Sequence, residues 1–224
     1  MRTLLAAVIA TAFVATSAMA APTTPKDGAE YWTLNTPQPV QASAKKIEVI
    51  EFFMYHCPAC NTFEPSLAAW VAKQGDAIHF RRIHLPHSAV NDPEAHLFLT
   101  LEAMGIEPAM HDKVEHAWHV EHKRLLSDAA NFEWAAANGI DKDKFAAAYK
   151  EFGVMVKLNS LSRLADNYQV DGTPTLIVDG RYLTSPTMVK KANIGTPEGE
   201  VYNATLQVVD ALVAKATKDH AGAK

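Results

Sequence analysis

The chain has 224 residues, of which 48% are hydrophobic and 21% are charged, and its formal net charge is −4. This composition is typical of a globular protein and excludes a disordered, collagen-like or coiled-coil chain. The small acidic excess provides no basic surface for nucleic acid, so we expect no nucleic-acid partner. The 2 cysteines are too few for a disulfide-stapled miniature protein or a four-cysteine zinc fold.

Residues 1–20 have the pattern of a secretory signal peptide. Arg2 gives a positive start, residues 4–14 form an apolar stretch, and residues 18–20 (AMA) form a small-residue cleavage pattern. The apolar stretch is too short to span about 30 Å of hydrocarbon. The alternative to a cleaved signal peptide is therefore an uncleaved anchor that lies at the membrane surface. We expect a mature protein that is exported to the periplasm, where disulfides persist.

The rest of the chain predicts alternating strands and helices. In chain order we expect an irregular start over 21–46 with an edge strand at 31–34, a buried strand at 47–55, a helix at 58–72 and a strand at 78–85. Further helices are expected at 94–104, 110–123, 131–138, 142–149 and 154–168, then hairpin strands at 175–178 and 181–183, a last helix at 198–217 and a frayed tail.

This order predicts an α/β protein with a thioredoxin fold and an inserted helical domain. The expected division places the first part of the thioredoxin fold at 21–90, the helical insert at 91–150 and the second part of the thioredoxin fold at 151–224.

Two cysteines that are three residues apart follow the buried strand and open a helix, in the order Cys57-Pro58-Ala59-Cys60. Unpaired N–H groups and the positive dipole end at a helix start favour a thiolate, so we expect a low pKa for Cys57. Cys60 lies one turn further along, so Cys57 should be the exposed, reacting sulfur and Cys60 the buried, resolving one. A stabilised thiolate favours the reduced pair and makes its disulfide a stronger oxidant.

Two other interpretations of the cysteine pair are weaker. Zinc would need two further ligands, and a CxxC between a strand and a helix is typical of a redox motif. A static disulfide closing so short a ring would add little stability.

Four histidines, His111, His116, His119 and His122, cluster on one predicted helix and could bind a metal. Acidic and basic side chains alternate with them, so we expect a solvated helix face and no metal site.

The second candidate feature is Gly172-Thr173-Pro174-Thr175, directly before a predicted strand. A cis bond before Pro174 would place this loop against the cysteines and expose its backbone to a peptide substrate. An ordinary trans turn proline is the alternative, because cis bonds are about 5% of X–Pro bonds.

The two motifs together carry a family resemblance. The segment VIEFFMYHCPACNTFEP resembles the active-site segment of periplasmic DsbA-type thiol–disulfide oxidoreductases, and DGTPTLIVDGRYLTSP resembles their cis-proline loop and hairpin. The resemblance implies disulfide formation in reduced, unfolded exported proteins. It also implies reoxidation by a quinone-linked inner-membrane oxidase of the DsbB type, and no cofactor beyond the redox-active disulfide.

The resemblance also implies roles for individual residues. Cys57 would be the nucleophile and Cys60 the buried cysteine, and Thr173 and Pro174 would meet the substrate backbone. Glu51 matches the family's buried acid, a proton-relay and redox-tuning position, and the basic partner of that acid falls near Arg82.

Two positions depart from the family pattern. Ala59 stands where many members carry a histidine that stabilises the thiolate, and His56, just outside the pair, could compensate.

Thr173 is the residue type of the related disulfide isomerases. Those proteins have a dimerisation domain before the fold, for which residues 21–46 are too few. We therefore expect a monomeric oxidase; an isomerase or reductase, or a His/Cys metal carrier, are the alternatives.

Overall fold

The structure, a computed structural model, describes residues 24–43, 45–87 and 91–222. The predicted signal peptide lies outside the described residues. Across the described ranges the strands form a five-stranded sheet in the order β1-β5-β4-β2-β3. They are β1 (Trp32–Thr33), β2 (Ile47–Phe53), β3 (Ile78–His84), β4 (Thr175–Val178) and β5 (Tyr182–Thr184).

The strand β2 lies inside the sheet, between β4 and β3, and is buried over its whole length, as its β-branched and aromatic sequence predicts. It pairs in parallel with β3 and antiparallel with β4. β4 pairs antiparallel with β5, and β5 with β1. The C-terminal end of β2 and the N-terminal end of β4 therefore meet at one end of the sheet, and both candidate motifs lie there.

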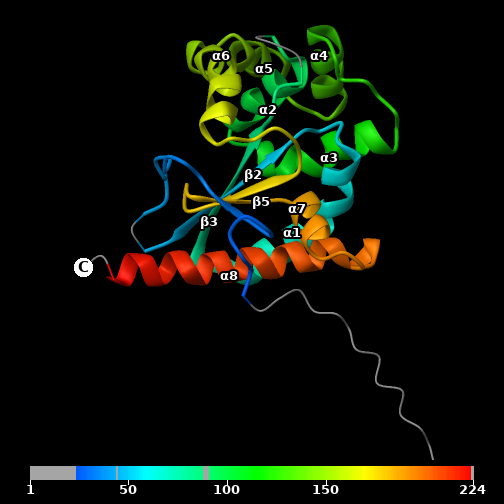
Figure 1. Cartoon of the computed structure of the whole chain (residues 1–224). Coiled ribbons are helices and arrows are strands. Elements are labelled where there is room, and N and C mark those ends of the chain that lie inside the picture. The colour runs from blue at the N-terminus through cyan, green and yellow to red at the C-terminus, as the bar shows by residue number, and fades with distance from the viewer. Residues whose placement is uncertain (1–23, 44, 88–90, 223–224) are drawn as a thin grey trace, which may run out of the picture.

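The helices cover the sheet in two groups. They are α1 (Pro58–Gln74), α2 (Pro93–Ala103), α3 (Glu107–His119), α4 (Asp128–Ala137), α5 (Lys142–Tyr149), α6 (Phe152–Asn167), α7 (Pro186–Ala192) and α8 (Val201–Gly222), with short 3₁₀ turns at Gly75–Ala77 and Glu198–Glu200. Figure 1 shows α2, α4, α5 and α6 gathered above the sheet, with α8 running beneath it.

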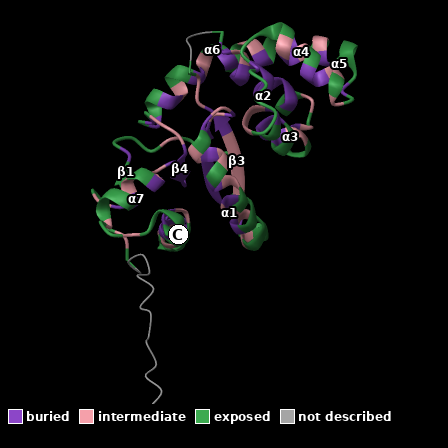
Figure 2. Cartoon of the chain, turned by 90° about the vertical axis from the view of Figure 1, so that its right-hand side faces the viewer, coloured by how far each residue is buried: buried purple, intermediate pink, exposed green. Residues whose placement is uncertain are grey.

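Two apolar cores correspond to these groups. One joins β2 to α2 and the helices that follow it, and includes Phe53, Phe98 and Leu158. The other joins the opposite face of the sheet to α1 and α8, and includes Leu67 and Leu212. The strands β2, β4 and β5 are accordingly buried, whereas β3 is partly buried and β1 is exposed (Figure 2). The chain leaves the sheet after β3 and returns at β4, so the pairing of β4 with β2 brings the two motifs together.

Most of the predicted elements are confirmed to within a few residues, with differences at several helix ends. Helix α7 was not predicted, although Ser185 caps it and Pro186 opens it. Helix α3 begins at Glu107 rather than residue 110. The C-terminal tail is helical to Gly222 rather than frayed. It is held by Asp219, which accepts a hydrogen bond of 2.8 Å from the hydroxyl of Tyr182 on β5.

The predicted domain boundaries at residues 90 and 150 stay predictions. The part of the chain that the structure describes has no helix long and apolar enough to span a bilayer.

Candidate active site

Cys57 and Cys60 lie where β2 gives way to α1. Cys57 is the N-cap residue, Pro58 is the first helical residue, and the Sγ of Cys57 accepts a 3.2 Å hydrogen bond from the backbone N–H of Cys60. Both cysteines are free thiols in this structure. Cys57 is 6% exposed and Cys60 is 3% exposed, so the expectation that Cys57 would be exposed is wrong. The reason is tertiary: the Sγ of Cys57 also lies 3.7 Å from the carbonyl oxygen of Thr173.

The pKa values of the two cysteines are shifted in opposite directions. The pKa of Cys57 is lowered to about 6, chiefly because the thiol of Cys60 donates to its sulfur, with backbone N–H groups at the helix start adding to this effect against the cost of burial. The pKa of Cys60 is raised, because its proton is held by Cys57, because it is buried, and because the charge on Cys57 opposes a second negative charge. The pair therefore holds one negative charge, on Cys57.

The second motif lies directly against this sulfur. The Thr173–Pro174 peptide bond is cis, and the hydroxyl of Thr175 donates a 2.8 Å hydrogen bond back to Gly172, which closes the turn into β4. Pro174 is buried and Thr173 is half-buried. The structure thus brings together Cys57, Thr173 and Pro174, although the cysteine and the loop are more than 100 residues apart in the sequence.

A buried acid lies beneath the cysteines. Glu51 on β2 is 1% exposed, and Nε of Arg82 on β3 donates a 2.9 Å hydrogen bond to it. Arg82 also donates to Glu64 on α1 at 2.6 Å. Burial raises the pKa of Glu51 to about 7, with Arg82 opposing this effect. The charge of Glu51 also contributes to the raised pKa of Cys60, so the acid and the buried sulfur are electrostatically linked.

His56, directly before Cys57 in the chain, forms an ion pair through Nδ1 with Glu94 at the start of α2. The side chain of Glu94 is 1% exposed. The hydrogen bond to Glu94 raises the pKa of His56 against the opposing effect of burial, and negative charge on Cys57 raises it further. A cationic His56 and an anionic Cys57 therefore stabilise one another.

Known proteins are similar to this chain in sequence and in fold. A family model described as the DSBA-like thioredoxin domain matches residues 48–193. The thiol:disulfide interchange protein DsbA of Burkholderia cepacia is 37% identical over 88% of this chain and 88% of its own length. The chain belongs to the DSBA-like thioredoxin family. The predicted family and the predicted thioredoxin fold with an inserted helical domain are confirmed.

Solved structures of family members superpose closely on this DSBA-like chain. The crystal structure of a point variant of Pseudomonas aeruginosa DsbA has a TM-score of 0.77 and 33% identity, and covers 87% of this chain and 99% of its own. A second Pseudomonas aeruginosa DsbA structure has a TM-score of 0.72 and 35% identity, and covers 88% of this chain and 96% of its own. The likeness therefore extends over both motifs and the helices between them.

The histidine cluster of this family member was predicted to be a solvated face, which is wrong for His111 and His119 but right for His116 and His122. His111 is buried, and its Nδ1 lies 2.7 Å from Glu107. His119 is mostly buried, with Nε2 at 2.8 Å from the carbonyl oxygen of Tyr55. His116 is exposed, and His122 lies beyond the helix with a φ of 56°. No group of three or more His, Cys, Asp or Glu side chains in the described ranges is arranged to hold a metal.

Sequence reasoning missed Glu94 and Glu115. Glu94 follows Asp92-Pro93, which reads only as a helix start, so nothing local indicates that its side chain turns inward to His56. Glu115 is 5% exposed on α3, and burial raises its pKa to about 9. The only sequence feature that bears on Glu115 is its place among the histidines, which predicted a solvent-exposed side chain.

Proposed function

We propose that this chain is a periplasmic thiol–disulfide oxidoreductase that introduces disulfide bonds into reduced, unfolded exported proteins through Cys57 and Cys60. The observation that carries the proposal is the asymmetry of the pair: Cys57 is a stabilised thiolate beside a protonated Cys60 at a helix start, against the cis-proline loop. Membership of a family whose curated relatives are named thiol:disulfide interchange proteins supports it.

The reaction is a two-step exchange between thiols and disulfides. A substrate thiolate attacks the Sγ of Cys57 in the Cys57–Cys60 disulfide, a mixed disulfide forms, and the Sγ of Cys60 leaves and takes up a proton. A second thiolate of the substrate then attacks the substrate sulfur of the mixed disulfide, and Cys57 leaves as a thiolate. The substrate loses two electrons and gains a disulfide, and the protein is left as a dithiol.

The low pKa of Cys57 drives this reaction forward. A thiolate that is stable at ambient pH is a good leaving group, so the mixed disulfide resolves toward the oxidised substrate. Because the thiolate exists only in the reduced protein, each pKa unit of stabilisation below ambient pH shifts the potential by roughly 30 mV toward oxidising power.

The surrounding residues have supporting roles in this proposal. Glu51 and His56 tune the charge on the cysteine pair, and Glu51 can exchange a proton near Cys60. Thr173 and Pro174 meet the substrate backbone beside Cys57. The cysteine pair is the only redox group that the reaction requires, and a quinone-linked inner-membrane oxidase of the DsbB type returns it to the disulfide. The protein acts as a monomer.

The test is oxidation of a reduced, unfolded protein by the purified, oxidised chain. We expect Cys57→Ser and Cys60→Ser each to abolish the activity, because neither variant can form the Cys57–Cys60 disulfide that oxidises the substrate. Full activity in Cys57→Ser rejects the proposal. The equilibrium of the pair with glutathione separates an oxidase from a reductase or isomerase, and a strongly reducing potential would favour the latter.

A further inference from the structure

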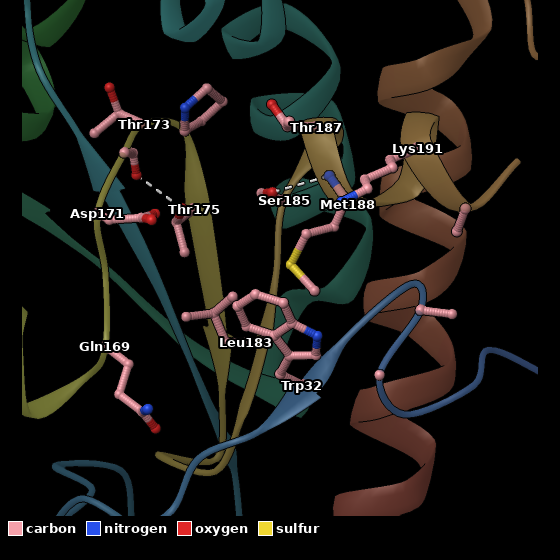
Figure 3. Close-up of a pocket in the computed structure, with 15 residues that line it drawn as sticks. Trp32, Gln169, Asp171, Thr173, Thr175, Leu183, Ser185, Thr187, Met188 and Lys191 are labelled. Atoms are coloured by element: carbon pink, nitrogen blue, oxygen red, sulfur yellow. Dashed lines mark hydrogen bonds between the residues drawn. The ribbon is translucent and has the colours of Figure 1, made fainter. Parts of the chain in front are cut away.

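Two parts of the molecule outside the cysteine motif lie near Cys57. One is the cis-proline loop, where Thr173 contacts the sulfur and lines a cleft together with α7 (Figure 3). The other is α3, which carries a buried acid, Glu115. Carboxyl groups are rarely buried so deeply, and the exchange steps described above make no use of this one.

Glu115 lies on the face of α3 that packs against the end of β2. Residues 111, 115 and 119 share this face, because they are four residues apart on a helix. One turn before Glu115, the ring of His111 packs against the ring of Tyr55 with 5.5 Å between the ring centres. One turn after it, Nε2 of His119 lies 2.8 Å from the carbonyl oxygen of Tyr55. Glu115 therefore packs between two contacts to a residue that is two positions before Cys57.

The carboxyl group of Glu115 lacks the partners that stabilise a buried negative charge. Its Oε2 is buried and has no hydrogen-bond partner among the residues that the structure describes. Nε2 of His119 lies 3.2 Å from this oxygen, but its proton is directed to the closer carbonyl oxygen of Tyr55, which can only accept. A buried carboxylate without hydrogen bonds is costly, so this geometry favours the protonated acid.

The charged groups that act on Glu115 from the neighbouring elements are mostly negative. They are Glu64 on α1, Glu51 on β2, Cys57 at the start of α1 and Arg82 on β3. Arg82 is the cation among them, and it already donates hydrogen bonds to Glu51 and Glu64. Burial raises the pKa of Glu115 to about 9, and the negative charges, including that of Cys57, add to this effect while Arg82 opposes it. Negative charge on Glu115 and negative charge on Cys57 therefore disfavour one another.

The redox state of the cysteine pair changes this repulsion. The disulfide carries no charge, whereas the reduced pair carries negative charge on Cys57. Reduction therefore raises the affinity of Glu115 for a proton, and by linkage a protonated Glu115 favours the reduced pair. A substrate dithiol that forms a disulfide gives up two electrons and two protons. When Glu115 starts ionised, Cys60 gains one proton and Glu115 the other, and the total charge of the three groups is the same before and after the exchange.

We propose that Glu115 is a positioning residue for the exchange reaction, which binds a proton when the Cys57–Cys60 disulfide is reduced and thereby makes the oxidising power of the pair depend on pH. The inference rests on the proposed function and adds to it a second buried acid besides Glu51. Glu115 acts through the charge of Cys57 and not by contact with the substrate. The coupling operates between the midpoint of Glu115 in the oxidised protein and its higher midpoint, about 9, in the reduced protein.

The experiment titrates Glu115 in both redox forms of the full chain. The glutamate carboxyl carbons are labelled with carbon-13, the resonance of Glu115 is assigned through its bonds to the backbone, and NMR follows it from mildly acidic to alkaline pH. We expect a midpoint of about 9 in the reduced protein and a lower midpoint in the oxidised protein. Glu121 is the matched control, because it is exposed beyond the end of α3 and pairs with Lys123. Its midpoint should be the same in both forms.

The Glu115→Gln protein gives a second readout, its equilibrium with glutathione at about pH 7 and at about pH 9. Glutamine stays neutral, so it does not oppose the thiolate of Cys57 at alkaline pH. We expect almost no change from the unmodified chain at the lower pH and a more oxidising pair at the higher pH. Midpoints of about 9 and about 8 in the two redox forms correspond to a roughly fivefold larger equilibrium constant at the higher pH. Glu121→Gln should change neither value.

Two outcomes overturn the inference. One is a midpoint of Glu115 that is the same in both redox forms or is lower in the reduced form. The other is a glutathione equilibrium of Glu115→Gln that changes by the same factor, or not at all, at both pH values. The proposed function fails separately, if the oxidised chain does not oxidise a reduced, unfolded protein. The titration of Glu115 does not depend on that activity, so the two failures are distinguishable.

Discussion

Nε of Arg82 donates a 2.9 Å hydrogen bond to Oε2 of Glu51 from the directly opposite position on the neighbouring parallel strand. The pair is buried, and burial raises the pKa of Glu51 to about 7 although Arg82 opposes the shift. Glu51 therefore changes its charge near neutral pH. When Glu51 is ionised, its negative charge contributes to the raised pKa of Cys60. A buried carboxyl with this property can couple proton uptake to the departure or return of the Cys60 sulfur.

Replacement of Glu51 by Gln should remove this coupling. Because the pKa of Glu51 is raised on folding, the folded chain binds more protons than the unfolded chain from about pH 4.5 to about pH 7. The contribution of Glu51 to stability therefore falls as the pH rises through that window. We expect Glu51→Gln to lose this part of the pH dependence of the free energy of unfolding, measured by denaturant titration at several pH values.

The matched control for this variant is Glu48→Gln. Glu48 lies on the same strand, is fully buried, and accepts a 3.0 Å hydrogen bond from Arg81, but at the other end of β2 from the cysteines. Both variants should lose stability, since each weakens a buried ion pair. Only Glu51→Gln should alter the pH profile of Cys60 attack on a Cys57–glutathione mixed disulfide. The same altered profile in both variants would rule out a specific role for Glu51.

The thiol of Cys60 should control the acidity of Cys57. Its hydrogen bond is the largest cause of the lowered pKa of Cys57. In the reduced protein we expect a thiolate transition in the ultraviolet absorbance with a midpoint at about pH 6, absent in Cys57→Ser. Cys60→Ala should move the midpoint up, whereas Cys60→Ser, which keeps a donor, should move it less. Equal midpoints in the two variants would mean that the donor is not the cause.

The core of the redox segment is predictable from the sequence because its signals are local. The apolar stretch of β2, the proline that opens α1 and the cysteine spacing lie within a few residues of one another, and each is decided by backbone geometry. Such features need little knowledge of the rest of the chain. Arg82, in contrast, was expected near Glu51 only from the family resemblance, and the structure places the two residues opposite one another on β3 and β2.

The features that were not predictable depend on distant packing. The low pKa of Cys57 was predicted from the helix start, but the contribution of Thr173 to it and the burial of Cys57 both depend on the distant cis-proline loop. His111 and Glu94 carry polar side chains that normally indicate solvent, and only the packing of α2 and α3 against the sheet turns them inward. Helix α7 is only 7 residues long, too short for a periodic pattern to stand out.

Reduction should stabilise the fold in a pH-dependent way. The pKa of Cys57 is depressed from an ordinary value of 9.0 to about 6, so its thiolate contributes stability that is fully present above about pH 9 and is lost as the pH falls through about 6. The oxidised protein has no thiolate and no such contribution. We expect the difference in unfolding free energy between the reduced and oxidised forms to grow from pH 6 to pH 9, as measured by denaturant titration of both forms.

Reduced Cys57→Ser provides the comparison for that experiment. It keeps a hydroxyl of similar size at the helix start but does not ionise in this range. Its stability should lack the increase between pH 6 and pH 9. If the increase persists in the variant, another group is its source.

The ion pair between His56 and Glu94 should lower the pKa of Cys57 in place of the histidine that Ala59 replaces. Glu94→Gln removes the hydrogen-bonded carboxylate that raises the pKa of His56. We expect the His56 titration, followed by NMR, to move to lower pH. Less imidazolium then faces Cys57 at neutral pH, so the thiolate midpoint of Cys57 should rise. Each unit of that rise should make the glutathione equilibrium less oxidising by roughly 30 mV.

The control is His116→Gln, because His116 is an exposed histidine that pairs with Glu121 on the surface. It should leave both the midpoint of Cys57 and the glutathione equilibrium unchanged. A Glu94→Gln protein in which His56 titrates at lower pH while Cys57 keeps its midpoint would show that the imidazolium does not act on the sulfur. In that case the helix start and Cys60 alone account for the acidity of Cys57.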